Sequence, residues 1–281
     1  MKYEIIAIDV DGTLVGPDQK VPAEAAAALA DAARAGLRVV LATGRSRVET
    51  MPVWRQLHLP TPYEPLILIG GALVSEPDAG RTLYHRPIPR ELAWEYADAL
   101  NGAGYSAAAI IDPWRHGLEY YFAESSDADY VWRRWFSRMD VKIRRVRRLS
   151  DAGDMPDPLR INAVVEPSDA EQLAAAMRER FGGRLEIHWI LAPNYGATVV
   201  EAFAAGVNKW TALRYVAQAY RVGPGRIVAA GDDVNDLAMV RAAGLGVAFP
   251  HSPPELRAAA RHVAEEGLAK FIRELMAGRF G

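Results

Sequence analysis

The sequence contains no cysteine among its 281 residues. This absence excludes disulfide bonds, thiolate metal ligands and a cysteine nucleophile, and it removes the usual sign of a small secreted scaffold. There is also no run of eighteen apolar residues, and the apolar segment Ile5–Ile8 near the N-terminus is too short for the core of a signal peptide. We therefore expect a cytoplasmic protein that does not partner a membrane.

Neither sign of charge is in excess, because 33 Lys and Arg residues face 35 Asp and Glu residues. This balance gives no general reason to expect nucleic acid as a partner. The six histidines show no spacing typical of metal ligands. Half of the residues are hydrophobic, which is enough to form a large core in one or two domains. We expect a monomer or a weak homo-oligomer.

Short apolar segments alternate with helical patterns at both ends of the chain. Ile5–Ile8 is apolar throughout, as in a strand that is buried on both faces of a parallel sheet. The alternation predicts an α/β fold with a doubly wound, Rossmann-like parallel sheet whose ligands bind at the carboxyl ends of the strands. The further predicted strands are 38–42, 226–230 and 245–248, and the predicted helices are 21–36, 208–220, 233–243 and 268–276.

The middle of the chain differs in composition, with most of the tryptophans and many arginines. We predict that residues 80–194 form an inserted α/β domain, flanked by core segments 1–79 and 195–281. Its strands alternate in polarity, which predicts an open sheet with helices on one face. The predicted strands are 82–85, 106–111, 118–123, 159–165 and 185–189, and the predicted helices are 90–100, 128–138 and 169–180.

Two segments of this insert stand out. An aromatic stripe, Tyr130, Trp132, Trp135 and Phe136, has helical spacing, which is typical of a helix packed on a sheet, although one ring could stack on a sugar or base. The basic segment 141–149 has apolar residues between its charges, which favours a solvated strand or loop over a nucleic-acid surface.

The first strand is followed by two carboxylates, Asp9 and Asp11, in the motif "DVDGT". Carboxylates beside a buried strand are costly unless something compensates their charge, and a hard divalent cation is the natural candidate. Gly12 permits a sharp turn of the backbone. An ordinary Asp-Gly turn at a strand end would explain this fragment equally well.

Further polar residues follow other predicted strands or begin a helix. Thr43 and Gly44 follow the second strand and are suited to hold a phosphate oxygen, or simply to cap a helix. Lys209 begins a helix, where a cation gains nothing from the helix dipole. Asp232 and Asp236 follow a third strand and are spaced to face the same pocket.

These motifs resemble those of the haloacid dehalogenase (HAD) superfamily of phosphatases, in particular the Cof-type branch with an inserted type-II (IIB) cap. Four signatures occur in the family's order: "DVDGT" from Asp9, "ATGR" from Ala42, "GVNK" ending at Lys209 and "GDDVND" ending at Asp236. The insertion of that branch falls between the second and third signatures, which is where the composition changes. The resemblance therefore spans the chain.

The resemblance implies a role for most of these residues. Asp9 would be the nucleophile that forms an aspartyl-phosphate, and Asp11 would be the general acid and base. Mg²⁺ would be held by the Asp9 carboxylate, the Asp11 backbone carbonyl and Asp232, and Asp236 would support the water shell of the metal.

The same resemblance implies that Thr43, the Gly44 amide and Lys209 contact the phosphate oxygens, together with Gly12 and Asn235. Asp233, at a variable position of the fourth signature, is expected to be an acid at a helix N-terminus rather than a ligand.

Two segments depart from the family pattern. The usual "NGA" after the third core strand is "GGA" here, at Gly70–Ala72, and residues 249–252 read Phe-Pro-His-Ser where a small residue followed by Asn-Ala is more usual. Both departures concern contacts with the leaving group rather than the phosphoryl chemistry.

The sequence therefore predicts a Mg²⁺-dependent phosphomonoester hydrolase acting on small phosphorylated metabolites, such as sugar phosphates or nucleotide-like compounds. Two alternatives remain: a phosphohexomutase of the same superfamily, and a catalytically silent metabolite-binding protein with this fold. Release of free phosphate would indicate the hydrolase, whereas formation of an isomeric sugar phosphate would indicate the phosphohexomutase.

Overall fold

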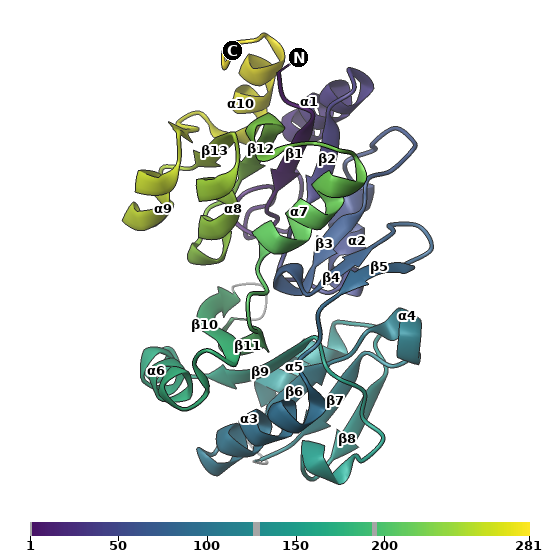
Figure 1. The fold of residues 1–281 in the computed structure, drawn as a ribbon, viewed down its shortest axis with the longest axis vertical. Helices are drawn as coiled ribbons and strands as arrows, with labels where there is room; N and C mark the ends of the chain where they lie inside the picture. The colour runs from purple at the N-terminus through teal and green to yellow at the C-terminus, as the bar shows by residue number, and fades with distance from the viewer. Residues whose placement is uncertain (1, 126–129, 193–195) are drawn as a thin grey trace. The chain divides into compact units, whose positions relative to one another are not determined.

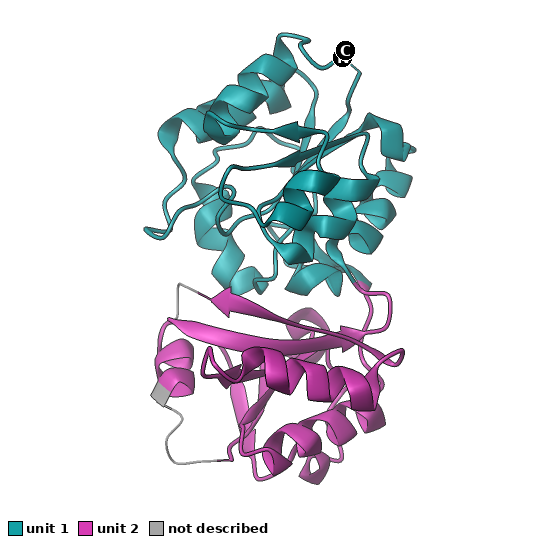
Figure 2. Cartoon of the chain, turned by 90° about the vertical axis from the view of Figure 1, so that its left-hand side faces the viewer, with its two compact units in different colours: residues 1–84, 208–281 teal, residues 85–207 magenta. Residues whose placement is uncertain are grey.

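A computed structural model describes residues 2–125, 130–192 and 196–281. The chain forms two compact units, one from residues 1–84 and 208–281 and the other from residues 85–207 (Figure 2). We call them the core unit and the inserted unit. Within the described ranges, no helix combines the length and the apolar character that crossing a membrane requires.

The core unit is built on a five-stranded parallel sheet in the order β14-β13-β12-β1-β2 (Figure 1). The strands are β1 (Ile5–Ile8), β2 (Arg38–Leu41), β12 (Ile227–Ala230), β13 (Leu245–Ala248) and β14 (His262–Val263). The helices are α1 (Ala23–Arg34), α2 (Arg47–Arg55), α7 (Lys209–Ala219), α8 (Leu237–Ala242), α9 (Pro254–Ala259) and α10 (Gly267–Met276). Parallel strands joined through helices confirm the predicted doubly wound α/β fold.

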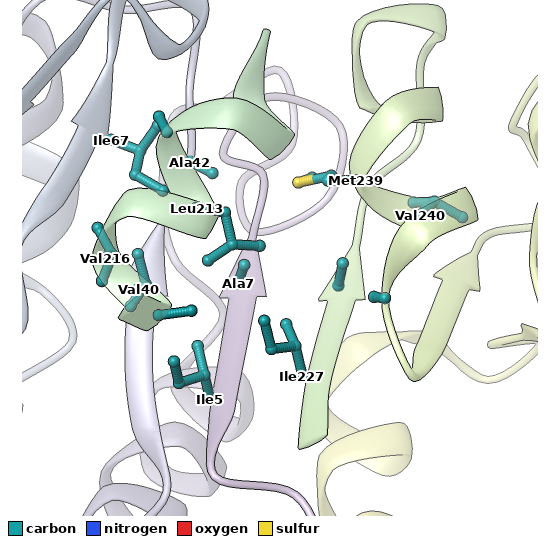
Figure 3. Packing of buried hydrophobic residues seen from close by; sticks show 14 of the residues in the cluster. Ile5, Ala7, Val40, Ala42, Ile67, Leu213, Val216, Ile227, Met239 and Val240 are labelled. Carbon is teal, nitrogen blue, oxygen red and sulfur yellow. The ribbon is translucent and has the colours of Figure 1, made fainter. Parts of the chain in front are cut away.

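The central strand β1 is buried on both faces. Ile5 and Ala7 belong to the cluster that α7 and α8 cover with apolar side chains (Figure 3). Ile6 and Ile8 are also fully buried, and the alternation of side chains along a strand directs them to the opposite face. Because no residue of β1 can be polar without loss of packing, the first polar side chain of this segment appears where the strand ends.

A small antiparallel sheet lies beside β2, and it consists of β3 (Leu66–Leu68), β4 (Leu73–Ser75) and β5 (Thr82–His85). A parallel bridge between Ala42 and Ile67 connects it to the main sheet. The sequence placed Thr82–His85 in the insert, with the boundary at 79/80. The strand forms there, but it pairs with β4, so the core unit continues to Tyr84.

The inserted unit contains a six-stranded sheet in the order β10-β11-β9-β6-β7-β8. Strand β11, which sequence analysis did not predict, pairs antiparallel with both β10 and β9. The unit therefore ends at Val207 rather than at the predicted boundary 194/195, which falls on residues outside the described ranges. The strands are β6 (Ala107–Ile110), β7 (Tyr120–Ala123), β8 (Ile143–Val146), β9 (Arg160–Val165), β10 (Leu185–Ala192) and β11 (Ala197–Ala204).

The helices of this unit cover both faces of its sheet rather than one. Trp132 of α5 packs on Phe122 of β7. Residues paired across neighbouring strands share a face, and the pairings that start at Phe122 lead through β6, β9 and β11 to His188 of β10. Trp189, the residue after His188, donates a hydrogen bond to Glu171 of α6. Neighbouring residues of a strand point to opposite faces, so α5 and α6 lie on opposite sides. The helices are α3 (Arg90–Gly102), α4 (Pro113–His116), α5 (Tyr130–Ser137) and α6 (Ala170–Phe181).

Both segments singled out in the insert have structural roles. Trp132, Trp135 and Phe136 are buried, which confirms the predicted packing of the aromatic stripe; the predicted start of this helix at 128 lies outside the described residues. The basic segment forms the edge strand β8, where Arg144 pairs with Asp154 and Arg145 with Glu124. Charged side chains on an edge strand hinder pairing with a second chain.

A buried ion pair crosses the sheet of the inserted unit. Arg160 of β9 donates to Glu201 of β11 at 2.9 Å, and His188 of β10 lies 2.9 Å from the other oxygen of that carboxylate. The side chains of Arg160 and Glu201 are only 5% and 2% exposed. The Coulombic attraction between two such charges compensates the cost of removing each from water, and loss of either partner removes that compensation.

We predict that Arg160→Met lowers the free energy of unfolding by about 3–5 kcal/mol, because Glu201 stays buried without its main partner. The double variant Arg160→Met/Glu201→Leu should recover most of that loss. Urea unfolding followed by fluorescence measures both values. Arg184→Met, which breaks the exposed pair with Glu95, is the control and should change the free energy little. Equal destabilisation in the single and double variants would contradict this account.

Candidate active site

Three segments far apart in the sequence meet at the carboxyl edge of the core sheet. Asp9 directly follows β1, Thr43 lies two residues after the end of β2, and Asp232 lies two residues after the end of β12. Because these three strands are parallel neighbours, their carboxyl ends lie at the same edge. The sheet therefore brings together residues that are far apart in the sequence, such as Asp9 and Asp232.

Lys209 is buried at this edge, with only 1% of its surface exposed. It is the first residue of α7, whose N-cap Asn208 accepts a hydrogen bond from the Thr211 amide. Its ammonium donates to Asp9 at 2.5 Å and to Asp236 at 2.7 Å. These two ion pairs explain why a lysine is tolerated at a helix N-terminus, where the dipole disfavours it.

Asp236 organises the loop after β12. One carboxylate oxygen accepts from Lys209, and the other accepts from the amides of Asp232 and Asp233 at 3.0 and 3.2 Å. Asp233 caps the short 3-10 turn Val234–Asp236 by accepting from the Val234 amide, as its predicted role at a helix N-terminus requires. The sequence predicted one helix over 233–243; in the structure this turn takes its first residues, and α8 begins only at Leu237.

Asp232 is held against the loop that follows β1. Its carboxylate accepts a hydrogen bond of 2.7 Å from the Thr13 hydroxyl, a contact that sequence analysis did not assign. Gly12 has φ +82°, and a Cβ atom there would lie 2.1 Å from an Asp232 oxygen. Gly12 therefore allows Asp232 to approach the backbone closely.

Asp9, Asp232 and Asp236 could together hold a metal ion. One carboxylate oxygen from each of them lies within 4.8 Å of the others. Three carboxylates present a set of hard oxygen donors, which suits Mg²⁺ or Ca²⁺ better than a soft transition metal.

The close approach of these acids changes their proton affinity. Burial, with the neighbouring Asp236 carboxylate, raises the pKa of Asp9 well above its usual value, and Lys209 offsets only part of this. Burial likewise raises the pKa of Asp232 to about 6, although the Thr13 hydrogen bond opposes the shift. Burial alone would lower the pKa of Lys209, but Asp236 and Asp9 outweigh it and raise that pKa. The cluster thus favours bound positive charge, whether protons, the lysine or a metal ion.

Asp11 is turned toward a different partner. Both of its carboxylate oxygens accept hydrogen bonds from the guanidinium group of Arg45. Arg45 ends the "ATGR" signature, but sequence analysis gave it no role, because the motif does not reveal the direction of its side chain.

The remaining predicted phosphate contacts surround the cluster. Thr43 is buried, its amide donates to Ile67, and its hydroxyl accepts from the Arg45 amide at 3.1 Å. Apart from Gly44 itself and its two chain neighbours, no atom lies within 4 Å of the place where a Cβ of Gly44 would stand, so this position faces open space. The side-chain oxygen of Asn235 lies 3.4 Å from the Lys209 ammonium.

Both departures from the family pattern lie at the site. Gly71 has φ +100°, and a Cβ there would lie 2.2 Å from the Asn208 carbonyl, so this glycine lets the start of α7 approach. Gly70 has φ +62°, a conformation that asparagine also adopts. Within 249–252, His251 stacks on Phe249, and its Nε2 lies 3.1 Å from the Gly12 carbonyl and 3.7 Å from Asp232.

Known proteins resemble the whole chain. The family model of haloacid dehalogenase-like hydrolases matches residues 6–272. Phosphatase YwpJ of Bacillus subtilis is 25% identical over 97% of this chain and 100% of its own length. Pyridoxal phosphate phosphatase YbhA of Escherichia coli is 26% identical over 97% of this chain and 98% of its own. A HAD/COF-like hydrolase structure from Plasmodium vivax superimposes with a TM-score of 0.79 at 20% identity, covering 98% of this chain and 96% of that one.

The match to the family model covers nearly all of the chain, and the predicted motifs lie within it. The chain thus belongs to the haloacid dehalogenase-like hydrolases, and the curated relatives named above are phosphatases.

Proposed function

We propose that this phosphatase hydrolyses phosphomonoesters of small metabolites through a phosphorylated Asp9. The observation that carries the proposal is the meeting of Asp9, Lys209 and Asp232 at one edge of the core sheet. Asp9 is buried yet lies at a strand end, so its carboxylate is held in place by the sheet. Such fixed positioning is what phosphoryl transfer chiefly requires of a protein.

In the first half of the reaction, an Asp9 carboxylate oxygen attacks the phosphorus and the bond to the leaving oxygen breaks. The protonated Asp11 carboxyl donates its proton to that leaving oxygen, and the product alcohol departs. Lys209 contributes positive charge beside Asp9, and Thr43 with the Gly44 amide supplies hydrogen-bond donors to the phosphate oxygens. The product of this half is an acyl phosphate on Asp9.

In the second half, Asp11, now ionised, accepts a proton from a water molecule as the water oxygen attacks the phosphorus. The bond between phosphorus and the Asp9 oxygen breaks, which releases inorganic phosphate and restores Asp9. One residue thus acts first as acid and then as base, and such catalysis typically contributes about 10²–10⁴-fold.

The residues present fit Mg²⁺, since the oxygen donors of the acidic cluster are those that it prefers. Burial, with the neighbouring Asp236 carboxylate, raises the pKa of Asp9, and a bound cation would favour its ionised form. The Asp9 carboxylate, the Asp11 backbone carbonyl and Asp232 would hold the ion, with Asp236 behind them. When bound, the ion supplies positive charge that offsets the repulsion between Asp9 and an anionic phosphate.

The substrates we propose are sugar phosphates or related phosphorylated metabolites. A relative named for pyridoxal phosphate aligns with this chain over 97% of the chain and 98% of its own length, which supports a small phosphorylated compound as the substrate. We propose further that residues 85–207 act as the cap domain that selects among such compounds.

Asp9→Asn should lower the release of phosphate from p-nitrophenyl phosphate by at least about 10³-fold, because an amide cannot serve as the nucleophile. The measurement is a phosphate assay at saturating substrate. Asp233→Asn is the matched control: this acid lies in the same site and asparagine can also cap the turn, so activity should stay close to that of the wild type. Retention of most activity in Asp9→Asn would remove the covalent mechanism.

Chelation should silence the enzyme, and Mg²⁺ should restore it. The assay is phosphate release from a panel of sugar phosphates in excess EDTA and then in excess MgCl₂. Turnover in EDTA equal to that in MgCl₂ would contradict the proposed role of the metal. Conversion of a sugar phosphate into its isomer without release of phosphate would instead indicate a phosphomutase.

Mg²⁺ should also raise the melting temperature, and more so above pH 6 than below it. Since the folded-state pKa of Asp232 is raised to about 6, the folded metal-free protein binds protons more tightly than the unfolded chain does. That stabilisation is present at low pH and is lost as the pH rises through about 6, where the bound ion replaces it.

Thermal melts at two pH values, on either side of 6, in MgCl₂ and in NaCl of matched ionic strength test this dependence. Asp232→Asn should remove most of the difference between the two pH values. An equal Mg²⁺ shift at both pH values in the wild type would contradict it.

A further inference from the structure

The guanidinium group of Arg45 is surrounded by acceptors. Its Nε donates to one Asp11 oxygen at 2.7 Å, and its Nη2 donates to the other Asp11 oxygen and to the side-chain carbonyl of Gln19. Its Nη1 donates to the Glu49 backbone carbonyl in α2 at 3.3 Å. The side chain of Arg45 is only 11% exposed, so these contacts are largely shielded from water.

Two parallel hydrogen bonds between a guanidinium and a carboxylate fix the plane of the carboxylate as well as its distance. A single bond, such as lysine could provide, would leave the Asp11 group free to rotate. Asp11 itself is partly exposed, at 36% of its side chain, and it lies in the loop after β1 rather than in a regular element. Its orientation therefore depends on the partner that holds it.

Arg45 is also tied to the predicted phosphate contacts. Its amide donates to the Thr43 hydroxyl at 3.1 Å, and the Thr43 carbonyl accepts from the Gly70 amide. The turn that places Thr43 thus also places the guanidinium that holds Asp11. Two functions of the proposed reaction, binding the phosphate and moving the proton, are connected through three consecutive residues.

We propose that Arg45, supported by Gln19, is a positioning residue that orients the Asp11 carboxyl group for proton transfer to the leaving oxygen. The inference rests on the proposed function, because it assigns a residue to the control of its general acid. Arg45 needs no contact with the substrate in this role. In the structure both Asp11 oxygens are on the guanidinium; for proton transfer one oxygen would stay there and fix the carboxyl group, while the other would be released to the leaving oxygen.

This role has a consequence that a purely structural role lacks. A strongly basic leaving group, such as phenolate, needs the proton from Asp11 as its bond to phosphorus breaks, whereas p-nitrophenolate departs with little help. The quantity kcat/KM reports the steps up to departure of the leaving group and is not affected by the later hydrolysis of the acyl phosphate. Misplacement of the acid should therefore lower kcat/KM for phenyl phosphate more than for p-nitrophenyl phosphate.

The experiment measures kcat/KM of the Mg²⁺-loaded wild type, Arg45→Gln and Arg45→Lys with both substrates. In Arg45→Gln we expect kcat/KM for phenyl phosphate to fall by about 10²-fold, and for p-nitrophenyl phosphate by less than about 10-fold. Arg45→Lys should lie between the wild type and Arg45→Gln, since lysine keeps the charge but not the paired hydrogen bonds. Arg55→Gln, at the exposed end of α2, is the control and should match the wild type with both substrates.

Gln19→Asn provides a variant that keeps Arg45 in place, in case Arg45→Gln does not fold. Gln19 has φ +61°, which asparagine tolerates, but the shorter side chain cannot reach the guanidinium in the same way. It should shift the substrate ratio in the same direction by a smaller factor.

An equal fall with both substrates, or no fall with either, in the variants that fold would overturn the role of Arg45. Different results would contradict the proposed function itself: a wild type that releases phosphate from neither substrate, or an Asp9→Asn variant that keeps its activity.

Discussion

The site depends on one buried cation among buried anions. Lys209 lies between Asp9 and Asp236, and all three side chains are almost completely removed from water. Isolated carboxylates at such burial would be too costly to keep ionised, and the ammonium offsets part of that cost for Asp9. The rest of the core unit acts as the scaffold that holds Lys209 next to Asp9.

Three local features determine the position of the lysine. The amide-capping side chain of Asn208 fixes where α7 begins, and Gly71 leaves room for the Asn208 carbonyl against the turn after β3. Leu213 and Val216, one and two turns further along α7, pack on β1 and its neighbours (Figure 3). The apolar cluster that stabilises the sheet therefore also fixes the position of Lys209 relative to Asp9. A substitution that weakens this packing should affect both the stability of the core unit and the geometry of the site.

Site residues that follow a recognisable local pattern can be predicted from the sequence. Asp9, Thr43 and Asp232 each follow a strand that is apolar over its whole length, and parallel strands place such residues at one edge without any further information. Strand β11 was missed because it contains Glu201, a buried acid whose partner Arg160 lies 41 residues earlier in the sequence. The position of α5 opposite α6 was missed because the sequence does not state which face of a strand a helix covers.

The same limit applies to the residues of the site. Arg45 was visible in a quoted signature, but its contact with Asp11 crosses 34 positions and depends on the direction of a long side chain. Thr13 ends the first quoted signature, but its partner Asp232 lies 219 residues away. The pattern of strands along the chain predicts which backbone segments lie together. The pairing of side chains within the site depends on packing, which only the folded structure reveals.

The charge of the site bears on how its reaction can begin. If Asp9, Asp232 and Asp236 are all ionised, one lysine leaves the cluster with an excess of negative charge, and a phosphate monoester brings more. Burial and the neighbouring Asp236 carboxylate raise the pKa values of Asp9 and Asp232, and a protonated Asp9 would be a poor nucleophile. A site that must attack an anion with a carboxylate therefore needs a second positive charge besides Lys209. The acidic cluster that creates this need also provides the oxygen ligands that could satisfy it.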